Sequence, residues 1–212
     1  GLGDVYKRQM KINSNITVRE VKNDDELKEF VMFPHKLYKD SKYWVAPIIK
    51  EELEVLNKEN NPVFKNADAH YFLAFINGEI VGRIAALINW VEVNDLKKKK
   101  VRFGWFDFVD NKEVSKSLLN EVVKIGNDNN LEFIEGPVGF SNMDKAGMLI
   151  KGFEKKNTMI TLYNHSYYKD HMIAHGYRKL AEWVEYELKI ANYEDSPETV
   201  SYTHLRAHET SL

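Results

Sequence analysis

The first candidate for chemistry in this chain is a turn between a strand and a helix. Residues 102–119 read RFGWFDFVDNKEVSKSLL, an apolar strand that runs directly into a helix. The free backbone N–H groups at the start of a helix attract anions, so such a turn is a common place to hold a phosphate. Lys112 and Lys116 could add positive charge there, although lysines on a first helical turn are more often simply solvated.

The same turn contains no glycine and begins with an acid. Asp110 and Glu113 have the spacing of a capping box, which predicts that the Asp110 carboxylate accepts from the N–H groups near Glu113. A carboxylate in that place satisfies the donors that a phosphate would use, and it also repels the phosphate. Each such charge–dipole interaction is worth only about 0.3–1 kcal/mol at an exposed helix end, which weakens anion binding without forbidding it.

Two further polar features have both a functional and a structural interpretation. Asp107 is an acid inside the apolar strand, and burying it unpaired is very costly, so we expect it to pair with Arg83 or Arg102. His171 and His175 stand at i and i+4 on a predicted helix, a spacing that allows one metal ion to be bound from one helix face. The sequence offers no obvious third ligand beside them, so it predicts no metal site.

Two loops contain residue types that often bind ligands. The glycine-containing loop 136–153 follows a predicted strand, and loops held by a rigid sheet often carry binding groups. Asn142 and Asp144 in this loop either contact a substrate or serve local backbone turns. The basic run LKKKK at residues 96–100 has no aromatic residues between its charges for base stacking, so we interpret it as a solvated loop.

The composition indicates an ordinary globular domain. The chain has 212 residues, enough for one well-packed domain, and a formal net charge of −2, which gives no long-range field to attract nucleic acid or an anionic membrane. The absence of cysteine excludes disulfides, thiol catalysis and cysteine-bound metal. No apolar run approaches the roughly 20 residues of a spanning helix. We therefore expect a cytoplasmic protein without a nucleic-acid or membrane partner.

The two ends of the chain share no periodicity with the residues between them. GLGDVYKRQ (1–9) and VSYTHLRAHETSL (200–212) resemble translated sequencing-adapter sequence, as met in metagenomic reading frames. We expect both to be non-native and exclude them from the interpretation of the fold, as one would an expression tag. The domain is then predicted to span 10–199 and to be the N-terminal part of a longer protein whose C-terminal domain is missing.

Hydrophobic periodicity and turn residues predict ten elements between these ends. Asn77-Gly78 is a strong signal for a two-residue β-hairpin turn, and Gly176 is expected to cap the last helix. Pro34 should kink or end the first helix. The predicted elements are a strand at 16–21, helices at 23–40 and 48–60, strands at 70–76, 80–89 and 101–109, a helix from about 112, a strand at 131–138, a helix at 168–175 and a strand at 179–190.

This order predicts an α/β fold with a mixed, mostly antiparallel central sheet. The hairpin at Asn77-Gly78 requires antiparallel pairing of the strands that it joins. The strand–helix–strand unit at 101–138 requires a parallel pair with a right-handed crossover. We therefore expect helices on both faces of the sheet.

The order of elements, together with the ending YYKDHMIAHGYRKLAEWVEYEL, resembles the GCN5-related N-acetyltransferase (GNAT) superfamily. The resemblance lies in the Asn-Gly hairpin and in the succession of a helix, a Gly-Tyr pair and a long strand, and it covers about residues 16–190. It implies an acyl-CoA N-acyltransferase-like fold for a divergent member. Fold alone does not establish activity.

The resemblance also implies a cofactor site. In the superfamily the fourth strand splays from the fifth, here around Phe108 and Ile134, and the pantetheine arm of an acyl-CoA lies between them. Its pyrophosphate sits on a glycine-rich turn, and the matching turn here, 110–117, lacks the glycines and is shorter. The implied cofactor is acetyl-CoA or another acyl-CoA, and the positions that match its binding residues are Phe106, Phe108, Val109, Lys112, Ser115 and Lys116.

Acyl transfer to an amine needs a base for the attacking amine and an acid for the leaving thiolate. The usual acid of the superfamily is a tyrosine four residues before the last glycine, and here that position is Met172. Tyr168 is the candidate acid instead, with aromatic packing and a hydrogen bond at the rim as the alternative for it and for Tyr167. Glu135, at the end of the fifth strand, is the candidate base.

Two functions remain open from the sequence. One is an acyl-CoA-dependent N-acetyltransferase that acts on an amine of a small molecule or a protein. The other is a non-catalytic domain that uses the same fold for binding or as a structural part of a larger protein. The missing glycines and Met172 favour the second function, whereas the retained pattern of elements favours the first.

Overall fold

The structure is a computed structural model that describes residues 15–141, 143–158 and 161–186. The chain divides into two units, residues 1–177 and 178–212. All the helices and strands of the described residues lie in the first unit. The candidate site lies entirely within this unit.

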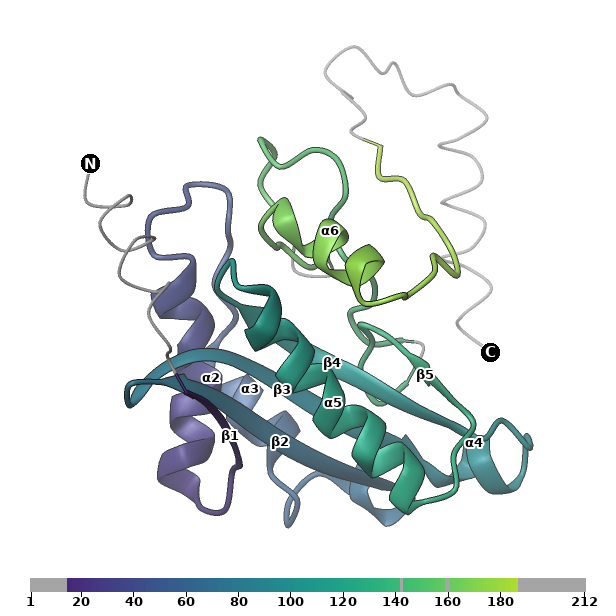
Figure 1. Ribbon diagram of the computed structural model, residues 1–212. Helices are drawn as coiled ribbons and strands as arrows, with labels where there is room; N and C mark the ends of the chain where they lie inside the picture. The colour runs from purple at the N-terminus through teal and green to yellow at the C-terminus, as the bar shows by residue number, and fades with distance from the viewer. Residues whose placement is uncertain (1–14, 142, 159–160, 187–212) are drawn as a thin grey trace, which may run out of the picture. The chain divides into compact units, whose positions relative to one another are not determined.

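The first unit is built on a five-stranded mixed sheet (Figure 1). All neighbouring strands are antiparallel except the last pair, which is parallel. The predicted hairpin is confirmed, with φ values of 52° at Asn77 and 84° at Gly78, as a tight two-residue turn requires. In spatial order the strands are β1 (Ile16–Glu20), β2 (Ala67–Ile76), β3 (Glu79–Asn89), β4 (Lys100–Phe108) and β5 (Phe133–Glu135).

Helices cover both faces of this sheet, as predicted. Figure 1 shows α5 on the near face and α2 and α3 behind the sheet. Alternate residues of β3 serve the two cores: Ile84 and Ala86 pack on the α5 side, and Ala85 and Leu87 pack on the α2 side. The helical elements are α2 (Asp24–Leu37), α3 (Ile49–Leu56), the 3-10 turn η1 (Pro62–Lys65), α4 (Trp90–Asn94), α5 (Lys112–Asp128) and α6 (Tyr167–Ala174).

The helix α2 runs through Pro34 to Leu37, so Pro34 does not end the helix, and a kink at Pro34 remains a prediction. Pro34 has no N–H to donate to the carbonyl of Phe30, four residues earlier. Arg83 of β3 takes that place, with its Nη1 2.9 Å from the Phe30 oxygen. The tertiary contact therefore satisfies the acceptor that the proline leaves open, and it ties α2 to the sheet.

A bulge in β4 decides which of its side chains face which core. The register of the β3–β4 pair shifts between Arg83 and Ala85, and Trp105 has a φ of 45°. Because the extra residue changes the alternation, Phe103 and Phe106 both pack on the α5 side, while Trp105 packs on the α2 side.

The predicted last strand, 179–190, is not formed in the described residues. Residues 179–186 adopt neither helix nor strand, and 187–190 lie outside the described residues. Alternation of apolar residues is a local signal, and a strand also needs a partner for its backbone groups. The predicted domain limits of 10–199 remain a prediction.

Candidate functional site

The parallel strands β4 and β5 pair only at one end. Lys100–Arg102 pair with Phe133–Glu135, and the Val138 N–H still donates to the Phe103 carbonyl at 2.8 Å. A Cβ at Gly104 would lie 2.7 Å from the Val138 oxygen, so the two chains remain in close contact up to this glycine. Beyond Gly104 no described strand pairs with this edge of β4. The strands therefore part, as the resemblance implied, but not at Ile134, which is still paired with Val101.

Side chains of α6 cover the free edge at the far end of β4. Because the Val109 N–H donates to β3, the backbone groups of the preceding residue, Phe108, point to the opposite side. Both are satisfied by α6: the Phe108 N–H donates to Tyr168 Oη at 3.0 Å, and its carbonyl accepts from Tyr167 Oη at 2.5 Å. The Tyr168 ring also stacks on the Phe108 ring at 4.2 Å between centroids. The chain itself therefore fills this part of the predicted slot.

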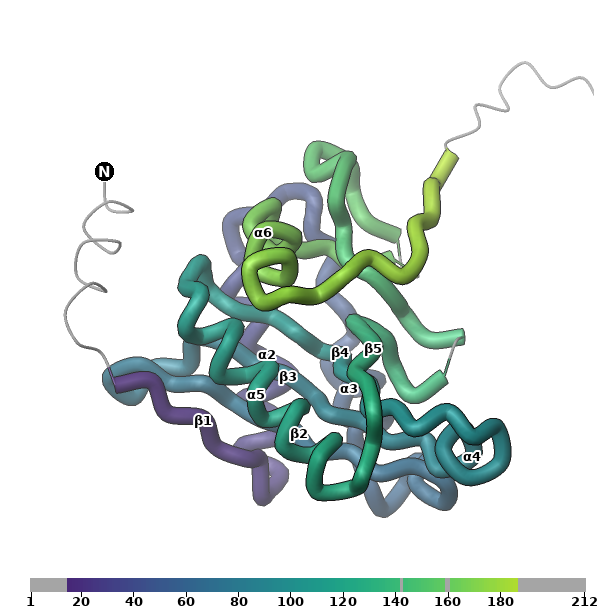
Figure 2. Tube along the Cα trace, turned by 45° about the vertical axis from the view of Figure 1, so that its right-hand side comes forward, coloured from purple at the N-terminus to yellow at the C-terminus, as the bar shows by residue number. Residues whose placement is uncertain are grey.

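A second set of α6 side chains reaches the start of α5, beside which α6 lies in both Figure 1 and Figure 2. Ser115 Oγ is fully buried and lies 2.9 Å from His171 Nδ1 and 2.8 Å from His175 Nε2. His171 Nε2 lies 3.1 Å from Asp110 Oδ1. An ionised carboxylate only accepts hydrogen bonds, so His171 Nε2 carries the proton of this contact.

The cap of α5 differs from the prediction. Asn111, not Asp110, is the N-cap residue, and its side-chain oxygen accepts from the N–H groups of Glu113 and Val114. Asp110 lies one residue before the cap and contacts His171 instead. Asn and Asp cap helices about equally well, so spacing alone could not decide between two adjacent residues.

Asp107 has the partner that was expected. Arg83 holds its Oδ2 through Nε and Nη2, both at 2.8 Å, and Tyr38 Oη donates to its Oδ1 at 2.7 Å. Tyr38 Oη also lies 2.9 Å from Tyr168 Oη. Since Tyr38 gives its proton to the carboxylate, the Tyr168 hydroxyl donates to Tyr38, and the bonds run in one direction from Phe108 to Asp107. Burial, and then the Asp107 charge, raise the pKa of both tyrosines well above the usual value, so both stay protonated at neutral pH.

Sequence reasoning missed the polar contacts of Tyr38 and the aromatic side chains around it. The rings of Trp44, Tyr163 and His165 lie 5.0–5.5 Å from the Tyr38 ring, and burial lowers the pKa of His165. Three separate segments bring these residues together. The apolar stripe of the first helix includes Tyr38, the residue that caps the end of α2, but no local signal could have revealed its partners.

No protein-family model matches the chain. Two curated proteins are similar to it in sequence. Protein YghO of Escherichia coli K12 is 29% identical over 172 residues, which cover 79% of this chain and 44% of YghO. The bacterial ceramide synthase of Caulobacter vibrioides is 26% identical over 176 residues, which cover 82% of this chain and 46% of the synthase. The chain thus spans less than half the length of these relatives.

Two solved structures share its architecture. A predicted acetyltransferase of Clostridium acetobutylicum, solved with acetyl-CoA, has a TM-score of 0.50 at 13% identity, and the match covers 85% of this chain and all of that one. The chain has the GNAT fold. AAC(6')-Iy, solved with the bisubstrate analogue CoA-S-monomethyl-acetylneamine, also has a TM-score of 0.50, at 14% identity, with 83% of this chain and 99% of that one covered.

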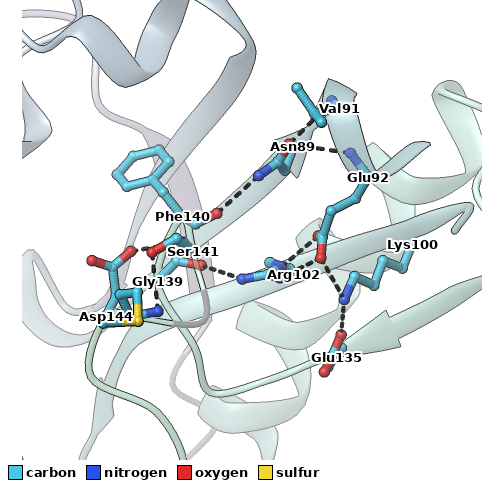
Figure 3. Close-up of polar contacts among 11 residues, drawn as sticks. Asn89, Val91, Glu92, Lys100, Arg102, Glu135, Gly139, Phe140, Ser141 and Asp144 are labelled. Carbon is cyan, nitrogen blue, oxygen red and sulfur yellow. Dashed lines mark hydrogen bonds and ion pairs between the residues drawn. The ribbon is translucent and has the colours of Figure 1, made fainter. Parts of the chain in front are cut away.

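Within this GNAT fold, Glu135 lies at the closed end of the β4–β5 pair. Its carboxylate pairs with Lys100, whose Nζ also lies 3.1 Å from Glu92 (Figure 3). Glu92 also accepts from Arg102 at 2.6 and 2.9 Å. Burial alone would raise the pKa of Glu92, but hydrogen bonds and charge from Arg102 and Lys100 outweigh it and hold the pKa low. Glu135 therefore belongs to a largely buried network of charged residues.

The two candidate catalytic residues are not brought together. Glu135 is level with Arg102, whereas Tyr168 is level with Phe108, six residues further along β4. Because β4 contains a bulge, the length is taken from β3, where the partners Leu87 and Gly82 are five residues apart, which is roughly 17 Å at about 3.3 Å per residue. Their roles as base and acid remain predictions. The carboxylate that the structure links to Tyr168, through Tyr38, is Asp107.

The loop after β5 is held by the same charged network. Arg102 Nη1 donates to the Gly139 carbonyl at 3.2 Å, and Asn89 Nδ2 donates to the Phe140 carbonyl at 3.2 Å (Figure 3). The Asp144 carboxylate accepts from the Ser141 N–H at 2.7 Å, so it closes a local turn. Asn142 lies outside the described residues. Substrate contact by Asp144 or Asn142 remains a prediction.

The predicted cofactor residues gather at one end of β4, but in this arrangement they do not fit an acyl-CoA. The polar groups of Phe108 and Ser115 are occupied by α6, and the Val109 N–H is used by β3. Lys112 and Lys116 are exposed at the start of α5, while the Phe106 side chain packs in the core. Acyl-CoA could use these groups only after α6 had moved.

Two further absences concern the described residues alone. In that part of the chain, no three histidine, aspartate or glutamate side chains are grouped so that they could hold a metal ion. No described helix combines the length and the apolar character needed to cross a membrane.

Proposed function

We propose that this chain takes part in acyl-CoA-dependent N-acyl transfer, in which an amine receives an acyl group from a thioester and an amide forms. The observation that carries the proposal is the early end of the β4–β5 pairing, at Arg102 and Glu135. At the Phe108 end, no described strand pairs with this edge of β4. Hydroxyl groups of the short helix α6 contact the edge instead. The structural neighbours solved with acetyl-CoA and with a CoA-containing analogue support the proposal.

The acceptor that we propose is an amine on a small molecule. The analogue bound by AAC(6')-Iy contains an acetylated aminoglycoside fragment, and a ceramide is the amide of a fatty acid with a long-chain amino alcohol. Both names therefore describe acylation of an amine. Whether the acyl group is acetyl or longer is a separate question, which a series of acyl-CoAs can address.

Tyr168 is the proposed proton donor. Its raised pKa keeps the hydroxyl protonated at neutral pH, as a donor requires. In the arrangement of the structure Tyr38 and Asp107 hold this hydroxyl, so Tyr168 would act as the donor only from a displaced α6. The role of Glu135 as the base is proposed from its position at the end of β5, and its ion pair with Lys100 would have to open for it to accept a proton.

The test is release of the thiol from acyl-CoAs of increasing chain length in the presence of a panel of small amines. Because the chain has no cysteine, a thiol reagent reports only released CoA, and mass spectrometry identifies the amide. We expect amine-dependent release that falls at least tenfold in Tyr168→Phe, since a positioned acid contributes about 10²–10⁴-fold. Saturable acyl-CoA binding without any amide product would contradict the proposal.

The alternative function is a non-catalytic GNAT-fold domain. It is favoured by the occupation of the slot by α6 and by Met172 at the position of the usual acid, where Met172 packs in the core. Such a domain would bind no acyl-CoA at millimolar concentration and would release no thiol. The same experiment therefore separates the two functions.

A further inference from the structure

We propose that α6 is an internal plug: it occupies the acyl-CoA slot, so that docking of α6 and binding of the cofactor exclude each other. The inference rests on the function proposed above and concerns the regulation of the same site. It explains why a fold shared with acetyl-CoA-bound structures has its slot filled by its own residues.

The polar contacts of α6 lie at the strand edge where the resemblance implies a pantetheine arm. An amide of the arm would accept from the Phe108 N–H and donate to the Phe108 carbonyl, and here Tyr168 accepts from the first and Tyr167 donates to the second. One residue of β4 thus has both of its edge-facing groups satisfied by two consecutive tyrosines. A ligand and α6 cannot hold the same two groups at once.

The next turn of α6 covers the start of α5, where Asn111 holds the N–H groups of the first turn and the α6 side chains hold the Ser115 hydroxyl. His171 and His175 both contact Ser115, in the first turns of α5, where backbone dipoles favour an anion. Lys112 and Lys116 flank this place and are exposed, so positive charge remains available to phosphate groups that displace the histidines. The contacts of α6 therefore extend from the strand edge to the helix start, in the order in which pantetheine and pyrophosphate follow each other in CoA.

The plug can leave without breaking the sheet. The helix α6 has eight residues, and helices this short are marginal without tertiary contacts. It takes no part in the strand pairing, and it is followed by Gly176 with a φ of 83°, which completes its end. Its buried apolar anchors are Tyr168 and Met172. These contacts hold α6 in the slot. Because they involve one short helix outside the sheet, α6 can leave while the sheet stays intact.

The experiment compares the affinity for CoA, by calorimetry, of the wild-type chain, Tyr167→Phe, His175→Ala and the double variant. Neither substitution replaces a residue of β4 or α5, and each removes one contact of α6 to these elements. If only the unplugged form binds, each lost contact raises the fraction of that form, and the apparent affinity should rise about three- to tenfold per contact. Tyr71→Phe is the matched control, since it removes a buried hydroxyl that donates to Leu56 on the opposite face of the sheet. Its affinity should equal that of the wild type.

Hydrogen exchange supplies a second readout that does not depend on activity. Saturating CoA should increase exchange of the α6 amides and decrease exchange at the start of α5. If the wild type binds CoA and the variants bind it with equal or lower affinity, or α6 becomes more protected, the plug is refuted while the proposed function stands. If neither the wild type nor the double variant binds CoA at millimolar concentration, the proposed function is refuted as well.

Discussion

The pair between Arg83 and Asp107 should be the most sensitive charged contact beside the site. Both side chains are largely buried, at 7% and 13% exposure, and Arg83 holds Asp107 with two contacts of 2.8 Å. Asp107→Asn keeps the shape and removes the charge, which leaves a buried guanidinium without its counter-charge. Removing one partner of a buried pair costs about 3–5 kcal/mol. The amide oxygen can still accept from Tyr38 or Arg83, so we expect the lower end, about 3 kcal/mol.

The assay is urea unfolding followed by the fluorescence of the four tryptophans. With a slope of about 2 kcal/mol per molar urea, the midpoint of Asp107→Asn should fall by about 1.5 M. Glu79→Gln is the matched control, because Glu79 pairs with Lys36 at 3.0 Å but both side chains are about 70% exposed. An exposed pair is worth about 0–1 kcal/mol, so this midpoint should fall by less than about 0.5 M.

A second substitution separates charge burial from packing. Adding Arg83→Met to Asp107→Asn removes the unpaired charge and should recover part of the lost stability, because no buried ion then lacks its partner. The recovery is only partial, because Arg83→Met also removes the donor to the Phe30 carbonyl. Equal midpoint shifts in Asp107→Asn and Glu79→Gln would refute the reasoning. The reasoning would also be refuted if the double variant lost more free energy of unfolding than the two single variants lose together.

Two further predictions concern stability. Burial lowers the pKa of His35, His165 and His175 below 6.5, so the folded chain binds fewer protons than the unfolded one just below that pH. Stability should therefore fall as the pH drops below about 6.5, and a urea midpoint at pH 5.5 that equals the one at pH 7.5 would contradict this. Asn111→Ala should cost about 1 kcal/mol as the loss of a cap, and Asp110→Ala should cost less. If Asp110→Ala lowered the urea midpoint more than Asn111→Ala, Asp110 would be the residue that caps α5.

Much of the fold could be predicted because its signals are local. The Asn77-Gly78 turn dictates an antiparallel pair, and the strand–helix–strand order at 101–138 dictates a parallel one. Where two residues competed for one role, the prediction was wrong, as with Asp110 and Asn111 at the start of α5. The last strand, 179–190, was also predicted from alternation alone, and 179–186 did not form it.

The candidate site could be predicted only in outline. The sequence placed a candidate cofactor turn at the start of α5 and a candidate acid at Tyr168, and both lie at the same end of β4. It placed Glu135 beside them, although Glu135 lies at the other end of the strand pair. The two ends of a strand lie too far apart to share one site. The position of Glu135 next to a turn in the sequence does not show whether it lies at the paired or the unpaired end of β4 and β5.

The sequence by itself determined the order of the elements, the pairing directions that its turns require, and the absence of thiol chemistry, because these follow from residue types and short spacings. Only the tertiary structure decided what occupies the free edge of β4. Tyr38, Asp107 and Tyr168 come from three distant segments and meet only after the sheet and its helices have packed. A buried polar group must find a partner wherever the fold supplies one, and for Phe108 and Ser115 that partner is α6.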